Sequence, residues 1–158
     1  ISPYKPMDII KYNCEFFGST YEGARKAAKK IIRASHKIPI SISPYIYFFP
    51  TASPDNPECT WISIDYLLYF REGGKNRTIV TLKNDQIIEL PISAISLQNQ
   101  IVRTVLLRAN LSKRHDEIRR KKRSIRRYRL IKSSEHPGTY GFDVFDFDND
   151  KGFNKDPF

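Results

Sequence analysis

The first third of the chain combines short apolar runs with one strongly basic segment. The apolar run over residues 12–17 predicts a short strand. A hydroxyl residue, Ser19 or Thr20, can then cap a helix that we expect over about residues 22–34. Its alanines and isoleucines fall on one side and its cations on the other. Prolines and serines over residues 35–44 predict extended or turning chain.

The middle of the chain has the pattern of β-structure. We expect a strand over residues 45–49. Residues 62–70 alternate apolar and polar side chains, which predicts a single strand with one buried face. Two further apolar runs flank Asn84 and Asp85, which tolerate positive φ and therefore predict a β-hairpin.

A long helix is expected to follow from Ser93, whose hydroxyl can cap it. Its expected apolar stripe consists of Leu97, Ile101, Val105 and Leu106, continued at intervals of seven by Leu111, Ile118 and Ile125. Together the elements predict an α+β fold, with a mainly antiparallel sheet packed by a short basic helix and a long C-terminal basic helix.

Charge divides the chain into three parts. Residues 1–112 hold 14 basic and 9 acidic groups, residues 113–132 hold 11 basic and two acidic groups, and residues 133–158 hold six acids against two lysines. We therefore expect a folded α+β domain over residues 1–112, a basic helical extension over residues 113–132, and an acidic, Phe-rich tail over residues 133–158 that is disordered until bound.

Clustered cations predict a polyanionic partner, because counterion release supplies the free energy of binding. The candidate contacts with nucleic acid lie in the first helix and the segment after it, on the long helix, and at the start of its basic extension. They are Arg25, Lys26, Lys29, Lys30, Arg33, His36 and Lys37; then Asn99, Arg103 and Arg108; and finally Lys113, Arg114, Arg119 and Arg120.

Two of these assignments have an alternative. Arg103 or Arg108 can instead form an intramolecular salt bridge with Glu89 or Asp65. For His36 the simpler interpretation is an exposed loop histidine rather than a ligand.

The sequence gives little support for catalysis or metal binding. The three histidines are scattered, with no H-x-x-x-H or H-E-x-x-H spacing. Three alternating aspartates near the C-terminus resemble the start of a Ca²⁺ loop, but Lys151 and Pro157 replace its turn glycine and its bidentate glutamate. We expect no catalytic residue, no metal site and no cofactor. Cys14 and Cys59 are too few for a disulfide framework, and we expect buried thiols.

No run approaches the roughly 18 apolar residues that a membrane-spanning helix needs, so we expect no membrane partner and a cytoplasmic location. The chain opens on Ile1, with neither an initiating Met nor a signal-peptide pattern. We expect that it starts inside a longer natural sequence.

Several segments with few charges carry a more specific signal. In chain order they are residues 14–23 (CEFFGSTYEG), 35–40 (SHKIPI), 48–51 (FFPT), 59–63 (CTWIS) and 89–93 (ELPIS), followed by the pairs Asn99-Gln100, Arg103-Thr104 and Leu107-Arg108. In this order the segments resemble the signatures of the competence transcription factor (ComK) family of Gram-positive bacteria over about residues 12–111.

The resemblance implies a transcription activator of DNA-uptake genes that binds double-stranded DNA at AT-rich promoters. It implies recognition mainly through the minor groove, with DNA bending, by a homo-oligomer that is a dimer or a dimer of dimers. It also implies turnover through a protease adaptor, for which the acidic tail is a candidate handle. Association with the nucleoid follows. Narrow A-tract grooves have an enhanced negative potential, which suits the cationic candidates.

Other interpretations stay open: a non-specific DNA- or RNA-binding module that uses the basic helix, an inactive paralogue of the activator, and, more distantly, a nuclease. The chain also departs from the family pattern. Ala24 follows Gly23 where the family usually has Arg, and only residues 1–13 precede the first signature, where family members carry a longer segment. Beyond Leu111 the resemblance fades. We therefore expect specificity to reside in residues 12–111 and the basic extension to add affinity.

Overall fold

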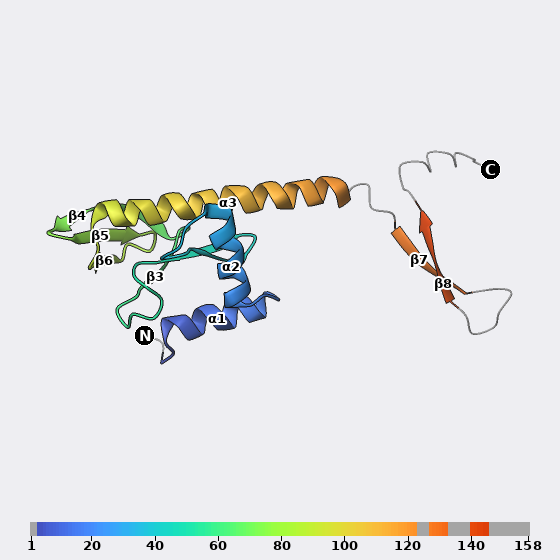
Figure 1. Ribbon diagram of the computed structural model, residues 1–158, viewed down its shortest axis with the longest axis horizontal. Coiled ribbons are helices and arrows are strands. Elements are labelled where there is room, and N and C mark those ends of the chain that lie inside the picture. Colours follow the sequence, from blue (N-terminus) through green and yellow to red (C-terminus); the bar gives the residue numbers. More distant parts are fainter. Residues whose placement is uncertain (1–2, 123–126, 133–139, 146–158) are drawn as a thin grey trace, which may run out of the picture. The chain divides into compact units, whose positions relative to one another are not determined.

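The computed structural model of the protein describes residues 3–122, 127–132 and 140–145 (Figure 1). The chain divides into two compact units, Ile1–Lys113 and Arg114–Phe158. The elements of the first unit are α1 (Pro6–Phe16), α2 (Tyr21–Ile32), β1 (Ile40–Ser43), β2 (Ile46–Pro50), β3 (Trp61–Ser63), β4 (Leu67–Gly74), β5 (Arg77–Leu82), β6 (Ile87–Leu90) and the larger part of α3 (Ala94–Lys122).

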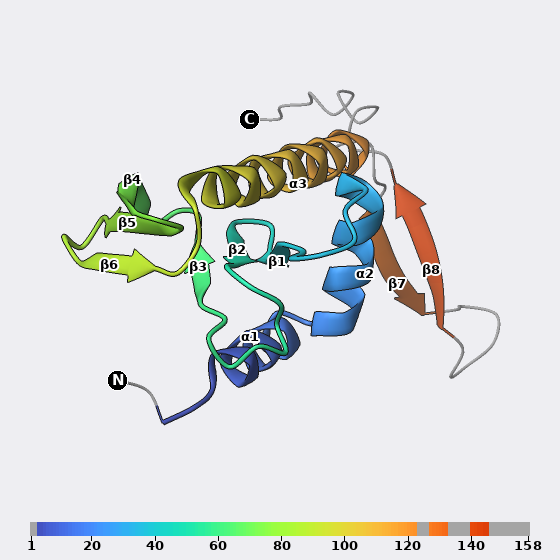
Figure 2. The same ribbon diagram turned by 60° about the vertical axis from the view of Figure 1, so that its left-hand side comes forward.

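Six strands of the first unit form two antiparallel three-stranded sheets, in the orders β1-β2-β3 and β4-β5-β6. Figures 1 and 2 show α3 running along both sheets, with α1 on the side away from α3 and α2 between the two helices. The predicted α+β class, with antiparallel strands, a short basic helix and a long C-terminal helix, is confirmed. The strands are divided between two sheets rather than joined in one.

The predicted strand over residues 12–17 is wrong, because these residues end helix α1 or follow it directly. Pro6 occupies the first turn, where its missing N–H costs nothing, and Asp8 favours the positive end of the helix dipole. Ile10 and Cys14, one turn apart, are buried on the same face. Gly18, at φ 78°, then turns the chain toward α2.

The helix predicted over about residues 22–34 is α2, which starts one residue earlier, and Thr20, one of the two predicted caps, is its N-cap. The backbone N–H of Gly23 donates to Thr20 Oγ1 over 3.1 Å. A Cβ atom at position 23 would lie 3.0 Å from that hydroxyl oxygen, so a larger residue would press on the cap. The helix ends at Ile32, and its C-cap Arg33 has the left-handed conformation.

The single strand predicted over residues 62–70 is wrong, since the segment contains β3 and β4, which belong to different sheets. A turn separates them, in which the N–H of Tyr66 donates to the carbonyl of Ser63 over 3.2 Å. The predicted hairpin is confirmed: β5 pairs with β6, and Asp85 takes φ 63° in the turn. The segment expected to be extended over residues 35–44 contains β1.

The hydrophobic core joins the two sheets through α3. One buried cluster combines Phe49 and Ile62 of the first sheet, Val80 and Leu90 of the second sheet, and Leu97 of α3. Each such side chain contributes about 1.5–3 kcal/mol by its removal from water. The N-terminal half of α3 therefore holds both sheets in one unit.

Farther along α3, a second buried cluster packs between this helix and α2. In it Ala28, Ile38, Tyr47 and Leu107 are buried, and Leu111 packs against them. The predicted apolar stripe of this helix was wrong at two positions, because Val105 and Leu106 are about half exposed. Its buried face is instead formed by Leu97, Gln100, Thr104 and Leu107. Two polar residues interrupt that face, which hid its phase in the sequence.

In the second unit, α3 ends at Lys122, and β7 (Arg127–Lys132) pairs antiparallel with β8 (Tyr140–Phe145). The basic helix expected over residues 113–132 was therefore predicted too long. Like charges one turn apart weaken a helix, which agrees with its earlier end. The disorder expected over residues 133–158 falls mostly outside the described residues, as does Ile125; where the structure describes that tail, it forms β8. The division into three domains stays a prediction.

Candidate nucleic-acid interface

The exposed face of α2 and its C-cap carries five cations. At about 100° per residue, the four helical cations fall within an arc of about 140°, and Arg33 follows them as the C-cap. All five side chains are exposed, while the opposite side of the helix packs on the core through Ala24, Ala28 and Ile31. This surface, called the α2 basic face below, consists of Arg25, Lys26, Lys29, Lys30 and Arg33.

The segment between α2 and β1 has an unusual backbone. Arg33 and Lys37 take φ values of 51° and 50°, in the left-handed region that residues other than glycine rarely adopt. Each such residue costs about 1 kcal/mol or more. The surrounding structure must supply interactions that hold this shape.

Two α3 side chains hold this segment, and both bind backbone carbonyls. Gln100 is buried, and its Nε2 donates to the carbonyls of Lys37 over 2.9 Å and Pro50 over 2.7 Å. Arg103 Nη1 donates to the carbonyl of His36 over 3.2 Å and lies 3.4 Å from Gln100 Oε1. The segment over residues 33–37, called the cationic loop below, is therefore fixed to α3 at two consecutive carbonyls.

Arg108 forms the intramolecular pair that was one of its two predicted alternatives. Its Nη1 lies 2.7 Å from Asp65 Oδ1, and its guanidinium carbon lies 5.3 Å from the centre of the Tyr47 ring. Glu89, the other acid considered as a partner, pairs with Arg77 at 2.9 Å. Arg108 thus has a structural task between α3 and the turn that joins the two sheets.

The remaining candidates are distributed along the chain. His36 is exposed in the loop after α2, while Lys37 is half-buried. Asn99 is exposed on α3. The C-terminal turns of α3 expose Lys113, Arg114, Arg119 and Arg120, of which the last three belong to the second unit. That any of these residues contacts DNA remains a prediction.

Two features of the site were missed in the sequence. Gln100 appeared only as part of a signature pair, although its spacing from Leu97 and Thr104 places it on the buried face of α3. Lys11 was not considered, because α1 was not recognised. In the structure Lys11 lines a cavity of about 590 Å³, called the α1–α2 cavity below.

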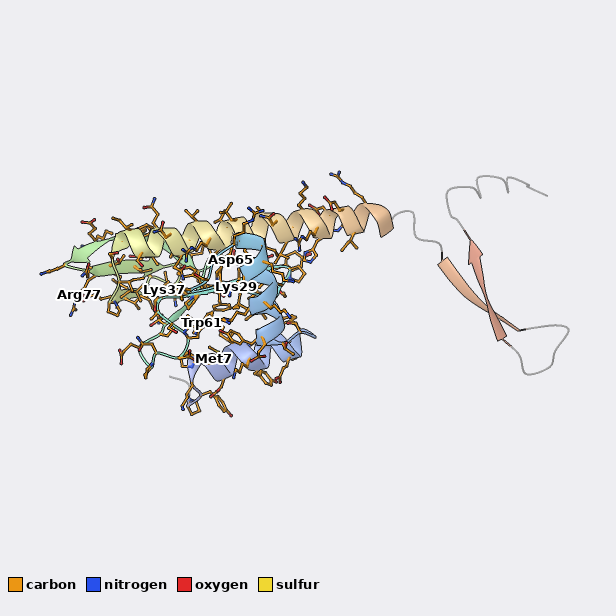
Figure 3. All side chains as sticks on the ribbon, in the orientation of Figure 1. Met7, Lys29, Lys37, Trp61, Asp65 and Arg77 are labelled. Carbon is orange, nitrogen blue, oxygen red and sulfur yellow. The ribbon has the colours of Figure 1, made fainter. Side chains whose placement is uncertain are left out.

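The α1–α2 cavity brings Lys11 of α1 together with Arg25, Lys26 and Lys29 of α2 and with Asp55 from the loop after β2. In Figure 3 the labelled side chains of Met7 and Lys29 mark its α1 and α2 sides. Tyr21 also lines the cavity, and burial raises the pKa of its phenol. The charge of Arg25 lowers that pKa and the charge of Asp55 raises it, because both charges lie close to the ring.

Both cysteines are buried free thiols, as predicted, and burial raises the pKa of Cys14. Among the residues that the structure describes, no three His, Cys, Asp or Glu side chains gather as they would around a metal ion. In the same part of the chain, no helix is both long and apolar enough to cross a membrane.

A family model described as "ComK protein" matches residues 1–116. The chain belongs to the ComK family. This confirms the resemblance seen in the sequence. The competence transcription factor of Bacillus subtilis (strain 168) is 40% identical to the chain over 114 residues, which cover 71% of the chain and 59% of that relative. The chain thus spans less than two thirds of the relative's length. No solved structure matches the chain significantly.

The ComK match includes every element from α1 to β6 and the part of α3 up to residue 116. It therefore contains the α2 basic face, the cationic loop and its two anchors, Gln100 and Arg103. Arg119 and Arg120 lie beyond the matched residues. The residues matched by the ComK family model therefore include the cationic surface of the first unit.

Proposed function

We propose that this ComK-family chain is a non-enzymatic, DNA-binding transcription activator of competence genes. The observation that carries the proposal is the α2 basic face, five exposed cations on one side of one helix. Such a surface suits the closely spaced phosphates of a duplex. The Bacillus subtilis relative, which is named a competence transcription factor, supports activation as the outcome of binding.

We further propose that the protein prefers AT-rich DNA and reads it mainly through the minor groove. The exposed positions of α2 include neither Asn nor Gln, the residues that typically read adenine in the major groove. The cationic loop offers Arg33 and His36 at its exposed surface, and the narrow groove of an A-tract attracts inserted cations. A cytoplasmic, nucleoid-associated location is part of this proposal.

Assembly into a dimer or a dimer of dimers is the third part of the proposal. α3 exposes Ile95, Val102, Val105 and Leu106, each about half exposed or more, on the side opposite its buried face. Apolar side chains at this spacing suit pairing with a second helix of the same kind. Two copies would present two α2 basic faces to one promoter.

Competition gel shifts at one fixed salt concentration test the proposal. The protein is offered a labelled duplex with A- and T-tracts and unlabelled competitors, either the same tracts or a GC-rich duplex of equal length. We expect the AT competitor to displace the probe at a much lower concentration. A third competitor with I·C in place of A·T pairs keeps the minor-groove pattern and changes the major-groove pattern, so we expect it to compete nearly as well.

A charge-matched pair of variants links the result to the α2 basic face. The double substitution of Lys29 and Lys30 by Ala should weaken binding, whereas the same change at Lys75 and Lys83, exposed lysines in the turns on either side of β5, should not. Equal competition by AT and GC duplexes would instead favour the non-specific module that uses the basic turns of α3. Cutting of the duplex in the presence of Mg²⁺ would favour the nuclease.

A further inference from the structure

The α1–α2 cavity is lined by charged side chains that, in the part of the chain that the structure describes, do not form ion pairs with one another. Four cations line it, Lys11, Arg25, Lys26 and Lys29, together with two acids, Glu22 and Asp55. Within the described side chains, the ion pairs are Arg77–Glu89 and Arg108–Asp65, so none of the six forms an ion pair in that part of the chain. The cavity keeps a surplus of two positive charges for an external anion.

The size and position of the cavity indicate which anion it suits. Its volume of about 590 Å³ lies within the range of about 300–1,000 Å³ that is usual for small-ligand sites, so it can admit a phosphate together with its sugar. Arg25, Lys26 and Lys29 belong to both the cavity and the α2 basic face. A strand whose phosphates lie along α2 therefore also meets the cavity.

We propose that the α1–α2 cavity binds a backbone phosphate of the DNA duplex, with Lys11 of α1 as a contact. This rests on the proposed DNA binding by α2 and extends it to a second helix. Lys11 is exposed and lies across the cavity from α2, so cations approach the phosphate from two elements. Asp55 faces the same space and opposes the binding of an anion.

The charges predict two substitutions with opposite effects. Each phosphate contact contributes about 0.9 to the slope of log K against log salt, so over the decade between 1 M and 0.1 M one contact is worth about eightfold in affinity. Lys11→Ala should therefore weaken binding about eightfold at about 0.1 M salt and reduce the slope by about 0.9. Asp55→Asn should strengthen binding.

Fluorescence anisotropy of a labelled AT-tract duplex, measured from about 50 to 200 mM salt, provides both quantities. Lys83→Ala and Asp85→Asn are the matched controls: they make the same charge changes at the second sheet, and Asn tolerates the positive φ of position 85. Lys11 is exposed on a helix and Ala is a good helix former, so Lys11→Ala should stay folded, as a thermal melt will show.

A loss with Lys11→Ala and a gain with Asp55→Asn, both absent from the controls, support the phosphate site. If the wild-type protein binds the duplex and Lys11→Ala binds it equally well, the cavity proposal fails while the proposed function stands. If the wild-type protein binds no duplex, the proposed function fails and the cavity proposal fails with it.

Inorganic pyrophosphate separates a DNA phosphate from a free one. We expect it to displace the duplex from the wild-type protein at lower concentration than from Lys11→Ala. If pyrophosphate binding depends on Lys11 while duplex binding does not, the cavity is a small-anion site, and its assignment to DNA is overturned.

Discussion

Gln100→Leu removes the side chain that joins α3 to the cationic loop. Leucine has a similar volume, so the change leaves little empty space, but the carbonyls of Lys37 and Pro50 lose their donor. An unsatisfied buried acceptor costs about 1–3 kcal/mol. The Pro50 carbonyl is buried, so its cost lies in the upper part of this range; the Lys37 carbonyl is only partly buried, so its cost is smaller. We expect a loss of roughly 2–4 kcal/mol in the free energy of unfolding.

Urea unfolding at neutral pH, followed by circular dichroism, measures this loss. For a unit of this size it corresponds to a fall in Tm of roughly 10 °C. Gln98→Leu is the control, because Gln98 is exposed on the same helix and its loss leaves no buried carbonyl without a donor. A second measurement is affinity for an AT-tract duplex at a temperature where both variants are folded, and we expect it to fall for Gln100→Leu alone.

Unfolding of Gln100→Leu and Gln98→Leu at the same urea concentration would contradict this prediction. In that case the two carbonyls would be satisfied in another way, and α3 would not hold the loop. A stability loss without a change in DNA affinity would keep the structural role and remove the role in binding.

Three further predictions concern the cationic loop, an ion pair and a buried phenol. Arg33→Gly relieves a left-handed backbone, so we expect stability to rise by up to about 1 kcal/mol while AT-tract affinity falls more than GC affinity; a uniform fall would make Arg33 a phosphate contact only. A double-mutant cycle between Arg108→Ala and Asp65→Asn should give a coupling of roughly 0.5–1 kcal/mol in unfolding experiments, and zero coupling would contradict the ion pair. Burial raises the pKa of Tyr21 above its ordinary 10.0. The contribution of Tyr21 to stability is therefore present below pH 10.0 and is lost as the pH rises through the folded-state pKa. Tyr21→Phe should lose less stability than the wild type at alkaline pH, and equal losses would exclude this cause.

Local signals in the sequence predicted the elements that local chemistry controls. Thr20 caps α2 because its hydroxyl reaches the N–H three residues on, and Asp85 turns the hairpin because it tolerates positive φ. Both features depend only on neighbouring residues. The α2 basic face could also be predicted from the sequence, because the cations of a helix that lie on one side mark the side that faces solvent.

The remaining features depend on residues distant in the chain. The period-2 pattern over residues 62–70 continues through the turn between β3 and β4, so alternation alone cannot show that the strand divides. The end of α1 resembled a strand because a short apolar run fits either period. The role of Gln100 follows from carbonyls 50 and 63 residues away, which no local pattern contains. The α1–α2 cavity likewise needs a loop that lies after β2.

The two anchors of the cationic loop, Gln100 and Arg103, are synthesised after the loop that they hold. The cations of α2 leave the ribosome long before Gln100 and Arg103 do, so we expect a growing chain to be positively charged before its cationic loop has a fixed shape. Because the loop depends on these anchors, a protease that cuts α3 would also affect it. We expect that a cut within α3 between Leu97 and Gln100 would leave every cation of α2 in place and still separate the loop from its two anchors.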